Sequence, residues 1–413
     1  MHNPLSKLSL SHRNILLTGG SGCIGSQLAK ALKSQGATLL LATSQQPESF
    51  KDRQNVSYFH ADFTNPQTHH PDYWQEVIES NDIDCVVNLA GGTSAPKSTH
   101  KHDVALRDIN YYPVQAMATA ISNVDSAELI YVSSMATKRV FPVELTEYSH
   151  SKFLAEEATR QIGGIIVRPD LVFSDHDSVS MRHAFSPNEV ATLKMPLPVI
   201  GSGKQTLQPV SLSETIEGLC RLIENPSRYK GEEFDFVGPD IFSQIGLLSL
   251  FKTIRGEKFY PMFFSASCKS FGLFKELAQT VPYGSFNASL IGALENADTH
   301  PSVSGYCPQK FKQLLDKQEL VSLYDTLDKD SLTFIKPPVK ELLMEILSSS
   351  KAMGISTQLS FYLVKEFIKA ILAGSKKYTA MGDERKGTRD ISLAELSQTR
   401  PNESESSSTS LRR

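Results

Sequence analysis

A chain of 413 residues is longer than one ordinary domain, so its length predicts two or three folded units. A hydrophobic fraction of 40% and a charged fraction of 21% are typical of a soluble globular protein, and a net charge of -3 gives no reason to expect a nucleic-acid partner. The chain has no signal-peptide core and no apolar run of about 18 residues, so we expect a cytoplasmic protein without a membrane partner. The five cysteines are scattered without a C-x-x-C pair, which indicates reduced thiols.

Short apolar segments alternate with helical patterns over residues 12–174. The sequence ATLLLA at residues 37–42 is a continuous apolar run, of the kind that is buried on both faces of a parallel sheet. The alternation predicts an α/β fold with a doubly wound, Rossmann-like parallel sheet. The predicted strands cover residues 14–18, 37–42, 56–60, 85–89, 129–132 and 164–167, and the predicted helices cover residues 26–35, 73–80, 104–123 and 148–161.

The pattern loosens from about residue 175. We expect residues 175–325 to form a smaller, mixed region that folds over the ligand crevice and returns once to the sheet. The sequence LPVIGSGKQ at residues 197–205 has the glycines of a hairpin or turn. An amphipathic helix is predicted over residues 212–223, and a strand is predicted over residues 233–237.

Two helical patterns follow in residues 331–374. In the second, Leu359, Leu363, Phe367 and Ile371 recur every four residues and form one apolar face. We expect this helix to pack on its own chain, and a membrane-surface or partner-binding helix is the alternative. The segment of residues 380–413 lacks the apolar content to fold, so it is predicted to be a disordered tail.

A glycine-rich turn directly follows the first predicted strand. In the sequence NILLTGGSGCIG at residues 14–25, Gly19, Gly22 and Gly25 stand three residues apart, and Gly20 gives a second register that fits G-x-G-x-x-G. Glycine is needed where φ becomes positive and where no Cβ can block a pyrophosphate that approaches the backbone. The helix that follows would direct its free N–H groups toward the phosphates. A tight turn without a ligand has the same composition, but this strand context favours a dinucleotide site.

A second group of polar side chains follows the later strands. Ser134 comes after the strand at residues 129–132, Tyr148 lies fourteen residues further on, and Lys152 follows one helical turn later in YSHSK. Because Tyr148 and Lys152 share a helix face, the ammonium would lower the pKa of the phenol toward the range of a general acid or base. A hydroxyl at Ser134 could bind the same substrate oxygen. The group suits hydride transfer at a carbonyl or alcohol carbon, with a nicotinamide as the redox group.

These motifs resemble those of the short-chain dehydrogenase/reductase superfamily, on the side of its extended and atypical members, the NAD-dependent epimerase/dehydratase-like proteins. The resemblance covers about residues 12–240 well and residues 241–325 weakly. It is carried by Asn110 and by the sequences TGGSGCIG (18–25), AD (61–62), NLAG (88–91), VSS (132–134), YSHSK (148–152), RPDLVF (168–173) and GSGKQTLQPVSLSETIEGL (201–219).

The resemblance implies a role for each catalytic position. Tyr148 would be the general acid/base, Lys152 would lower its pKa and hold the ribose, and Ser134 would orient the substrate oxygen. Asn110 would support Lys152 through the helix or through a water molecule. The cofactor-binding residues that it implies are Gly19, Gly22, Cys23, Ile24, Gly25, Ser44, Asp62, Phe63, Leu89, Ala90, Gly91, Tyr148, Lys152 and Pro169, with Asp62 near the adenine and Pro169 near the nicotinamide.

Two features depart from the family pattern. Sugar-nucleotide epimerases and dehydratases usually have a longer insert between the catalytic hydroxyl and the tyrosine. The short spacing from Ser134 to Tyr148 is closer to atypical members such as the nucleotide-binding accessory subunit of respiratory complex I. Where the second strand ends, an acidic residue would imply NAD, but this chain has TSQQ at residues 43–46 and Arg53 as the nearest cation. The predicted cofactor is therefore NAD or NADP.

Other polar residues have simpler explanations. The pairs His69-His70 and His100-x-His102 lie in polar loops without matching cysteine or carboxylate spacing, so we expect no metal site. The thiol of Cys23 could be redox-sensitive near a helix N-terminus, but a small apolar packing role is the expected one.

Together these observations predict an NAD(P)-dependent oxidoreductase or epimerase/dehydratase that acts on a hydroxyl or keto substrate by Tyr/Lys-assisted hydride transfer. A nucleotide sugar is the leading substrate class, followed by a lipid or isoprenoid-like alcohol. The alternative is a non-catalytic NAD(P)H-binding scaffold or regulator whose C-terminal helix docks a partner or a membrane. We expect a small-molecule substrate, and a homodimer stays open. The predicted organisation is an NAD(P)-binding domain (12–174), a substrate-binding region (175–325), a helical extension (331–374) and a disordered tail (380–413).

Overall fold

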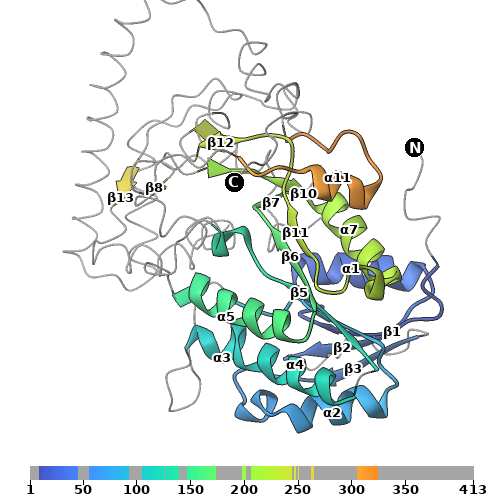
Figure 1. Cartoon of the computed structure of the whole chain (residues 1–413). Coiled ribbons are helices and arrows are strands. Elements are labelled where there is room, and N and C mark those ends of the chain that lie inside the picture. The colour runs from blue at the N-terminus through green and yellow to red at the C-terminus, as the bar shows by residue number, and fades with distance from the viewer. Residues whose placement is uncertain are drawn as a thin grey trace, which may run out of the picture. The chain divides into compact units, whose positions relative to one another are not determined.

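The computed structural model describes residues 9–44, 55–92, 105–124, 126–138, 147–173, 198–200, 206–243, 246–247, 250, 262–264 and 305–323. Contacts between Cα atoms divide the chain into two units, Met1–Phe259 with Phe263–Lys336 and Tyr260–Met262 with Pro337–Arg413. Almost all described residues belong to the first unit, which carries every element labelled in the sheet of Figure 1.

Seven parallel strands form one sheet in the order β11-β6-β5-β4-β1-β2-β3 (Figure 1). From β1 the chain continues outward through β2 and β3 on one side and through β4, β5 and β6 on the other. This order confirms the predicted doubly wound, Rossmann-like sheet. The strands are β1 (Asn14–Thr18), β2 (Thr38–Thr43), β3 (Val56–His60), β4 (Cys85–Asn88), β5 (Glu128–Val132), β6 (Ile165–Pro169) and β11 (Glu233–Phe236).

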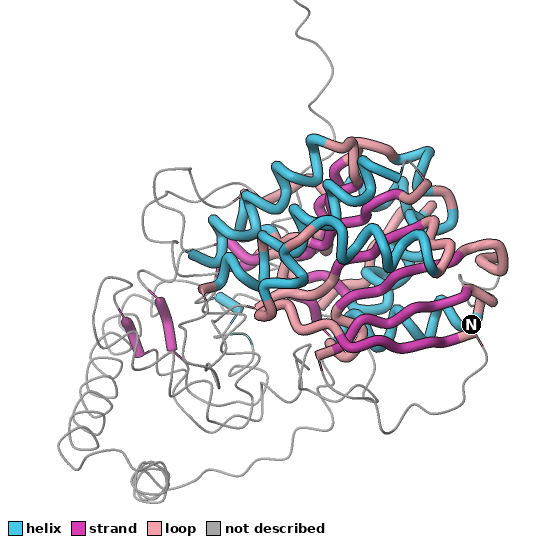
Figure 2. Tube along the Cα trace, turned by 90° about the horizontal axis from the view of Figure 1, so that it is seen from below, coloured by secondary structure: helices cyan, strands magenta, loops and turns pink. Residues whose placement is uncertain are grey.

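Successive side chains of each strand point into two different apolar layers. In β1, Ile15 and Leu17 belong to one buried cluster and Leu16 belongs to the other. The first cluster includes residues of α1, α7 and α11, and the second includes residues of α2, α4 and α5, so helices cover both faces of the sheet (Figure 2). This two-sided burial requires the apolar runs that the sequence shows. The helices are α1 (Cys23–Ser34), α2 (Pro71–Ser80), α3 (Leu106–Asn110), α4 (Tyr112–Val124), α5 (Glu147–Gln161), α7 (Leu212–Glu224) and α11 (Gln309–Leu315).

The neighbours of β1 fix the position of the ligand crevice. Thr18, the last residue of β1, is aligned with Ala42 of β2 and with Asn88 of β4. In such sheets ligands bind beyond the carboxyl ends of the strands, at the point where the strand order reverses. The segments that follow β1, β4 and β5 carry the predicted site residues, and they meet at this edge.

The helix predicted over residues 104–123 is two helices, α3 and α4. The break lies at Tyr111, which has φ −116° and ψ −61°. Pro113 explains the break, because proline offers no backbone N–H to the preceding turn and disfavours helical geometry at the residue before it. The break turns α3 into a separate short element that ends at Asn110.

The predicted return to the sheet is confirmed, because β11 pairs with β6 in parallel at its edge. The pair β7 (Val172–Phe173) and β10 (Val210–Ser211) is also parallel, whereas β9 (Thr206–Leu207) and β12 (Phe242–Ser243) are antiparallel. Ser211 caps α7 by accepting a hydrogen bond from the Glu214 backbone N–H. The other elements are the short helices η2 (Pro66–His69), η3 (Met135–Thr137) and η4 (Pro226–Tyr229) and the strands β8 (Pro198–Ile200) and β13 (Met262–Phe264).

Several sequence expectations lie outside the described residues. The helices predicted in residues 331–374 and the tail of residues 380–413 are among them, and the predicted turn at 197–205 is described only in β8. The four-part division of the chain therefore stays a prediction. Within the described segments, the model has no helix that is both long and apolar enough to span a bilayer.

Candidate active site

The glycine turn after β1 leaves no room for side chains. Gly19 has a φ of +69°, and a Cβ on it would lie 2.7 Å from the backbone nitrogen of Ala90. A Cβ on Gly25 would lie 2.1 Å from the carbonyl oxygen of Gly19. Gly22 is the N-cap of α1, and its N–H donates a 3.0 Å hydrogen bond to the same carbonyl. The turn is thus a bare backbone cradle at the positive end of a helix, which fits a pyrophosphate.

The ends of β1 and β4 are joined by hydrogen bonds. The Thr18 hydroxyl donates to the Asn88 side-chain oxygen at 3.1 Å and accepts from the Ala90 backbone N–H at 3.4 Å. The backbone N–H of Leu89 donates to the Thr18 carbonyl at 3.3 Å. These contacts bring the predicted cofactor residues Leu89, Ala90 and Gly91 beside the glycine turn.

Cys23 and Ile24 open α1 directly after this cradle. The Cys23 side chain is buried in the apolar cluster of that face, and burial raises the pKa of its thiol to about 12. A thiol with this pKa is not a reactive thiolate at neutral pH, which supports the packing role. Ile24 is partly buried against the same cluster.

Asp62 and Phe63 shape the loop after β3. The Asp62 carboxylate accepts hydrogen bonds from the Thr64 backbone N–H at 2.9 Å and from the Thr64 hydroxyl at 2.8 Å. Phe63 is buried and meets the Trp74 ring edge-on, with ring centres 5.8 Å apart. The Phe63 side chain therefore belongs to the core, and a cofactor contact at this position would involve its backbone.

Ser44 lies at the end of β2, where the sequence left the cofactor open. It is exposed, and its carbonyl oxygen lies 3.2 Å from Nε2 of His60 at the end of β3. Neither Thr43 nor Ser44 carries a charge, and Arg53 lies outside the described residues. The position thus offers neither a carboxylate for a ribose nor a cation for a phosphate.

Ser134 and Tyr148 are brought together from separate elements. Ser134 follows β5 and caps η3 by accepting a 3.2 Å hydrogen bond from the Ala136 N–H, and Tyr148 lies in the first turn of α5. Burial raises the pKa of Tyr148, and the nearby Ser134 hydroxyl lowers it in part. The net shift is upward because desolvation of the phenolate dominates, and the lowering of this pKa by Lys152 stays a prediction.

Lys152 is buried beneath the same site. Its Nζ donates to the Val132 carbonyl at 3.2 Å and lies 5.1 Å from the centre of the Tyr131 ring. Burial lowers the pKa of Lys152 to about 8, and the charge of Glu156 opposes this shift. A Cβ on Gly91 would lie 3.0 Å from this Nζ and 2.8 Å from the Asn110 side-chain oxygen. Gly91 therefore allows the 88–92 segment to approach both catalytic candidates.

Asn110 connects α3, the 91–92 segment and α5. Its side-chain oxygen accepts from the Gly92 N–H at 2.8 Å, and its side-chain nitrogen donates to the Gly92 carbonyl and to the Ser151 hydroxyl, both at 3.0 Å. Ser151 in turn donates to the Tyr148 carbonyl at 2.8 Å. The resemblance implies that Asn110 supports Lys152 through the helix or through a water molecule. The structure shows contact with the helix through Ser151, a residue to which the sequence assigned no role.

Two charged residues behind the site were also missed. Glu156 and Arg168 form a buried ion pair, with Nη2 of Arg168 2.6 Å from the Glu156 carboxylate. The available signals were the position of Glu156 four residues after Lys152 and the place of Arg168 directly before Pro169. Pro169 itself is buried at the carboxyl end of β6, beside Phe236 of β11.

Of the two histidine pairs considered as metal ligands, the structure describes His69-His70. Nε2 of His69 lies 2.9 Å from the carbonyl oxygens of Phe63 and Asp108, which gives this histidine a structural role. His100 and His102 lie outside the described residues, and the described part of the chain holds no cluster of three His, Cys, Asp or Glu side chains suited to a metal ion.

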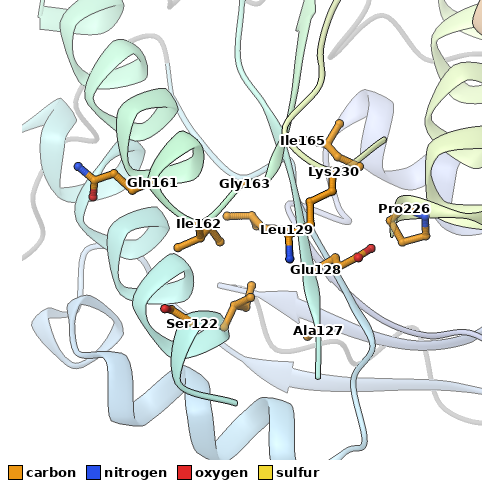
Figure 3. A pocket seen from close by; sticks show the side chains of 12 residues that line it. Ser122, Ala127, Glu128, Leu129, Gln161, Ile162, Gly163, Ile165, Pro226 and Lys230 are labelled. Atoms are coloured by element: carbon orange, nitrogen blue, oxygen red, sulfur yellow. The ribbon is translucent and has the colours of Figure 1, made fainter. Parts of the chain in front are cut away.

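A cavity of about 270 Å³ lies at the opposite edge of the sheet (Figure 3). Glu128, Leu129 and Ile165 at the amino-terminal ends of β5 and β6 line it, together with Lys230. Because the candidate catalytic residues follow the carboxyl ends of these strands, this cavity is not part of the candidate active site.

Solved structures with the same fold include nucleotide-sugar enzymes. The UDP-glucuronic acid 4-epimerase of Bacillus cereus, in complex with UDP-glucuronic acid and NAD, is 19% identical, with a TM-score of 0.53 over 76% of this chain and 96% of that chain. DesIV, the dTDP-glucose 4,6-dehydratase of Streptomyces venezuelae, is 15% identical, with a TM-score of 0.52 over 76% and 94%. An epimerase of Methanothermobacter thermautotrophicus is 16% identical, with a TM-score of 0.51 over 78% and 91%.

The family is shown by a sequence match that spans more than half of the chain. The model of the NAD dependent epimerase/dehydratase family matches residues 15–236, from β1 to the end of β11. This match confirms the predicted enzyme class and the nicotinamide dinucleotide cofactor, and the glycine cradle between β1 and α1 fits such a cofactor. The chain belongs to the NAD dependent epimerase/dehydratase family of short-chain dehydrogenase/reductase-type enzymes.

Proposed function

We propose that this protein uses NAD to transfer a hydride at a hydroxyl-bearing or keto carbon of a nucleotide sugar, as an oxidoreductase, epimerase or dehydratase. The observations that carry the proposal are the approach of the Ser134 hydroxyl to Tyr148 and the burial of the Lys152 ammonium one helical turn from Tyr148 on α5. A protein that only binds the dinucleotide requires the glycine cradle but not this group. The proposal therefore favours catalysis over the scaffold alternative.

The chain's own residues would hold the cofactor along the carboxyl edge of the sheet. The backbone of Gly19, Gly22 and Gly25 and the N-terminus of α1 would bind the pyrophosphate. Lys152 would donate to the ribose hydroxyls, and the 89–91 segment and Pro169 would line the nicotinamide half. The bound nicotinamide would supply the hydride acceptor and donor. We propose NAD as the cofactor, because the Bacillus cereus and Streptomyces venezuelae relatives were both solved with NAD.

Proton transfer would be carried out by Tyr148. Oxidation of an alcohol carbon removes a hydride from the carbon and a proton from its oxygen, and Tyr148 would accept that proton as the phenolate. In the reverse direction the neutral phenol would donate it back. The Ser134 hydroxyl opposes the effect of burial on the pKa of Tyr148, so the same hydroxyl would orient the substrate and ease the proton transfer.

A nucleotide sugar is supported by the relatives of the same fold. The Bacillus cereus epimerase was solved with UDP-glucuronic acid and NAD, and the Streptomyces venezuelae enzyme is a dTDP-glucose dehydratase. In both, the match extends over more than nine-tenths of the relative's chain.

The experiment is a substrate screen with wild-type protein and the Tyr148→Phe variant. NAD and NADP are titrated first, and UDP- and dTDP-sugars are then compared with free sugars and with lipid or isoprenoid alcohols. Nicotinamide absorbance reports net oxidation, and chromatography of the sugar products reports epimerisation and dehydration. Loss of a general acid/base should lower turnover by about 10²–10⁴-fold while NAD still binds.

Tyr73→Phe is the matched control, because Tyr73 is a phenol of α2 whose hydroxyl donates to the His60 carbonyl. Turnover by this variant should equal that of the wild type. Unchanged turnover in Tyr148→Phe with intact NAD binding would overturn the catalytic role, and turnover confined to lipid alcohols would overturn the substrate class.

A further inference from the structure

Glu156 has a buried carboxylate that touches three parts of the candidate site. Its Oε1 accepts hydrogen bonds from the Ser133 hydroxyl at 2.6 Å, from the Thr137 hydroxyl at 2.8 Å and from Nε of Arg168 at 2.8 Å. Its Oε2 accepts from Nη2 of Arg168 at 2.6 Å. The residue is 1% exposed, so these contacts replace its hydration. They join α5, β6 and the segment that follows β5.

The partners of Glu156 are neighbours of the candidate catalytic residues, not the catalytic residues themselves. Ser133 and Thr137 stand on either side of Ser134, so the carboxylate of Glu156 holds both flanks of the turn that presents the Ser134 hydroxyl. Glu156 also lies one helical turn after Lys152 and two turns after Tyr148 on α5. Residues at this spacing share a helix face. One side chain thus links the Ser134 turn to the helix that carries Tyr148 and Lys152.

Glu156 is a stable negative charge at neutral pH. Burial by itself would raise the pKa of its carboxyl group, but the hydrogen bonds and charge of Arg168 lower it overall, with further help from Ser133 and Thr137. Arg168 is 2% exposed and is also paired with Glu233 of β11 at 2.7 Å. Arg168 of β6, which Glu233 of β11 holds in place, therefore stabilises the charged form of Glu156.

This charge acts on Lys152. The ammonium lies over the ring of Tyr131 of β5 and is acted on by Glu156 of its own helix, and Tyr148 in turn acts on Tyr131. Burial raises the pKa of both Tyr131 and Tyr148, so both phenols stay neutral near pH 8. Among these groups Glu156 is the one that raises the pKa of Lys152 against the effect of burial.

We propose that Glu156 is a positioning residue of the active site, which holds the Ser134 turn against α5 through its hydrogen bonds with Ser133 and Thr137 and keeps Lys152 protonated. The proposal rests on the proposed function in that Lys152 and Ser134 act in hydride transfer. A buried ion pair adds little net stability compared with apolar residues of similar volume. The pair matters here because it holds a charge at a fixed position and joins separate segments of the site.

The test measures the ionisation of Lys152 in the protein without cofactor. Lysine labelled with ¹³C at Cε is titrated by NMR, and the Lys152→Met variant assigns the signal. In Glu156→Gln the pKa of Lys152 should fall by about 1 unit, because a nearby opposite charge favours the charged form. Glu156→Asp keeps the negative charge, so the pKa of Lys152 in this variant should stay close to the wild-type value.

Glu157→Gln is the matched control. Glu157 is the next residue of α5, its side chain is 47% exposed, and it pairs with Arg160 on the outer face. This variant should leave the pKa of Lys152 unchanged. If Glu156→Gln does not fold, the double variant Glu156→Met/Arg168→Met replaces the pair by apolar side chains, and the same fall in the pKa of Lys152 is expected. An unchanged pKa in a folded Glu156→Gln or double variant overturns the proposal.

A second readout separates this inference from the proposed function. In the substrate assay, Glu156→Gln should move the alkaline limb of the kcat/KM profile to lower pH, and a merely structural role would lower activity equally at every pH. If Tyr148→Phe is fully active, the proposed function fails, but the NMR titration still decides whether Glu156 sets the charge of Lys152. If Tyr148→Phe is inactive and the titration shows no shift, only the role of Glu156 fails.

Discussion

The side-chain nitrogen of Asn110 donates a 3.0 Å hydrogen bond to the hydroxyl of Ser151, which joins the end of α3 to α5. The same side chain makes two hydrogen bonds with the backbone of Gly92, so α3, the 91–92 segment and α5 are held by one buried amide. Ser151 lies between Tyr148 and Lys152 in the sequence. Asn110 therefore supports the candidate catalytic helix through the Ser151 hydroxyl.

Replacement of Asn110 by alanine should impair catalysis more than cofactor binding. The change removes three hydrogen bonds and leaves buried partners unsatisfied, which should lower the free energy of unfolding by about 1–3 kcal/mol. A displacement of α5 by about 1 Å should lower kcat by up to about 10²-fold. Steady-state kinetics and denaturant unfolding measure the two effects.

Ser151→Ala is the control for this change, because it removes only the contact with α5 and the bond to the Tyr148 carbonyl. Its effect on kcat should be smaller than that of Asn110→Ala. Wild-type kcat in a folded Asn110→Ala variant would remove Asn110 from the catalytic group.

Substitution of Gly19 by alanine should abolish NAD binding. Gly19 has a φ of +69°, and the added Cβ would lie 2.7 Å from the Ala90 backbone nitrogen, so the glycine turn must move away from the 89–91 segment. Isothermal titration calorimetry with NAD measures the loss, and circular dichroism reports whether the fold is retained.

Gly231→Ala provides the matched control for backbone strain. Gly231 has a φ of +75°, but a Cβ there would meet no atom within 4 Å. Both variants bear the cost of about 1–2 kcal/mol for an L-residue in this region, but only Gly19→Ala adds a clash. NAD affinity in Gly231→Ala should equal that of the wild type, and equal losses in the two variants would argue against a cofactor cradle at Gly19.

Lys152 should make the stability of the protein depend on pH between about 8 and 10. Burial lowers the pKa of Lys152 from 10.5 to about 8, so in this window the unfolded chain binds a proton that the folded protein lacks. Stability therefore rises with pH here, by at most about 1.4 kcal/mol per pH unit for this group. Lys152→Met should remove this rise when unfolding is measured at several pH values. An identical pH dependence in wild type and variant would show that Lys152 is not the titrating group.

The two arginines that bind Glu156 should differ in their effect on stability. Arg168 is 2% exposed, whereas the side chain of Arg160 is 34% exposed. Arg168→Met removes the buried partner of Glu156 and leaves it only the partly exposed Arg160, so it should cost about 3–5 kcal/mol. Arg160→Met breaks a partly exposed pair and should cost up to about 1 kcal/mol. Denaturant midpoints of the two variants measure the difference, and equal costs would contradict the burial of the Glu156–Arg168 pair.

The sheet could be predicted from the sequence because two-sided burial leaves a strong local signal. The strands at Asn14–Thr18 and Val56–His60 have the predicted bounds, and β2, β4, β5 and β6 differ from the predicted strands by one or two residues at one or both ends. Ile15 and Leu16 are buried in different apolar layers, so no polar residue interrupts the apolar run. The break at Tyr111 was missed, because the helical pattern on both sides of Pro113 is continuous.

By itself the sequence determined the order of the strands and helices, the glycine turn and the positions of Ser134, Tyr148 and Lys152, because these depend on local periodicity and motif spacing. Only the tertiary structure decided how the charges behind the site are paired. Glu156, Arg168 and Glu233 come from α5, β6 and β11, and their burial and pairing set the pKa values of their side chains. Although burial raises the pKa of Glu233, its bonds with Arg160 and Arg168 lower it to about 2. Desolvation and pairing depend on neighbours far apart in the chain, so the motifs alone do not give the pKa shifts.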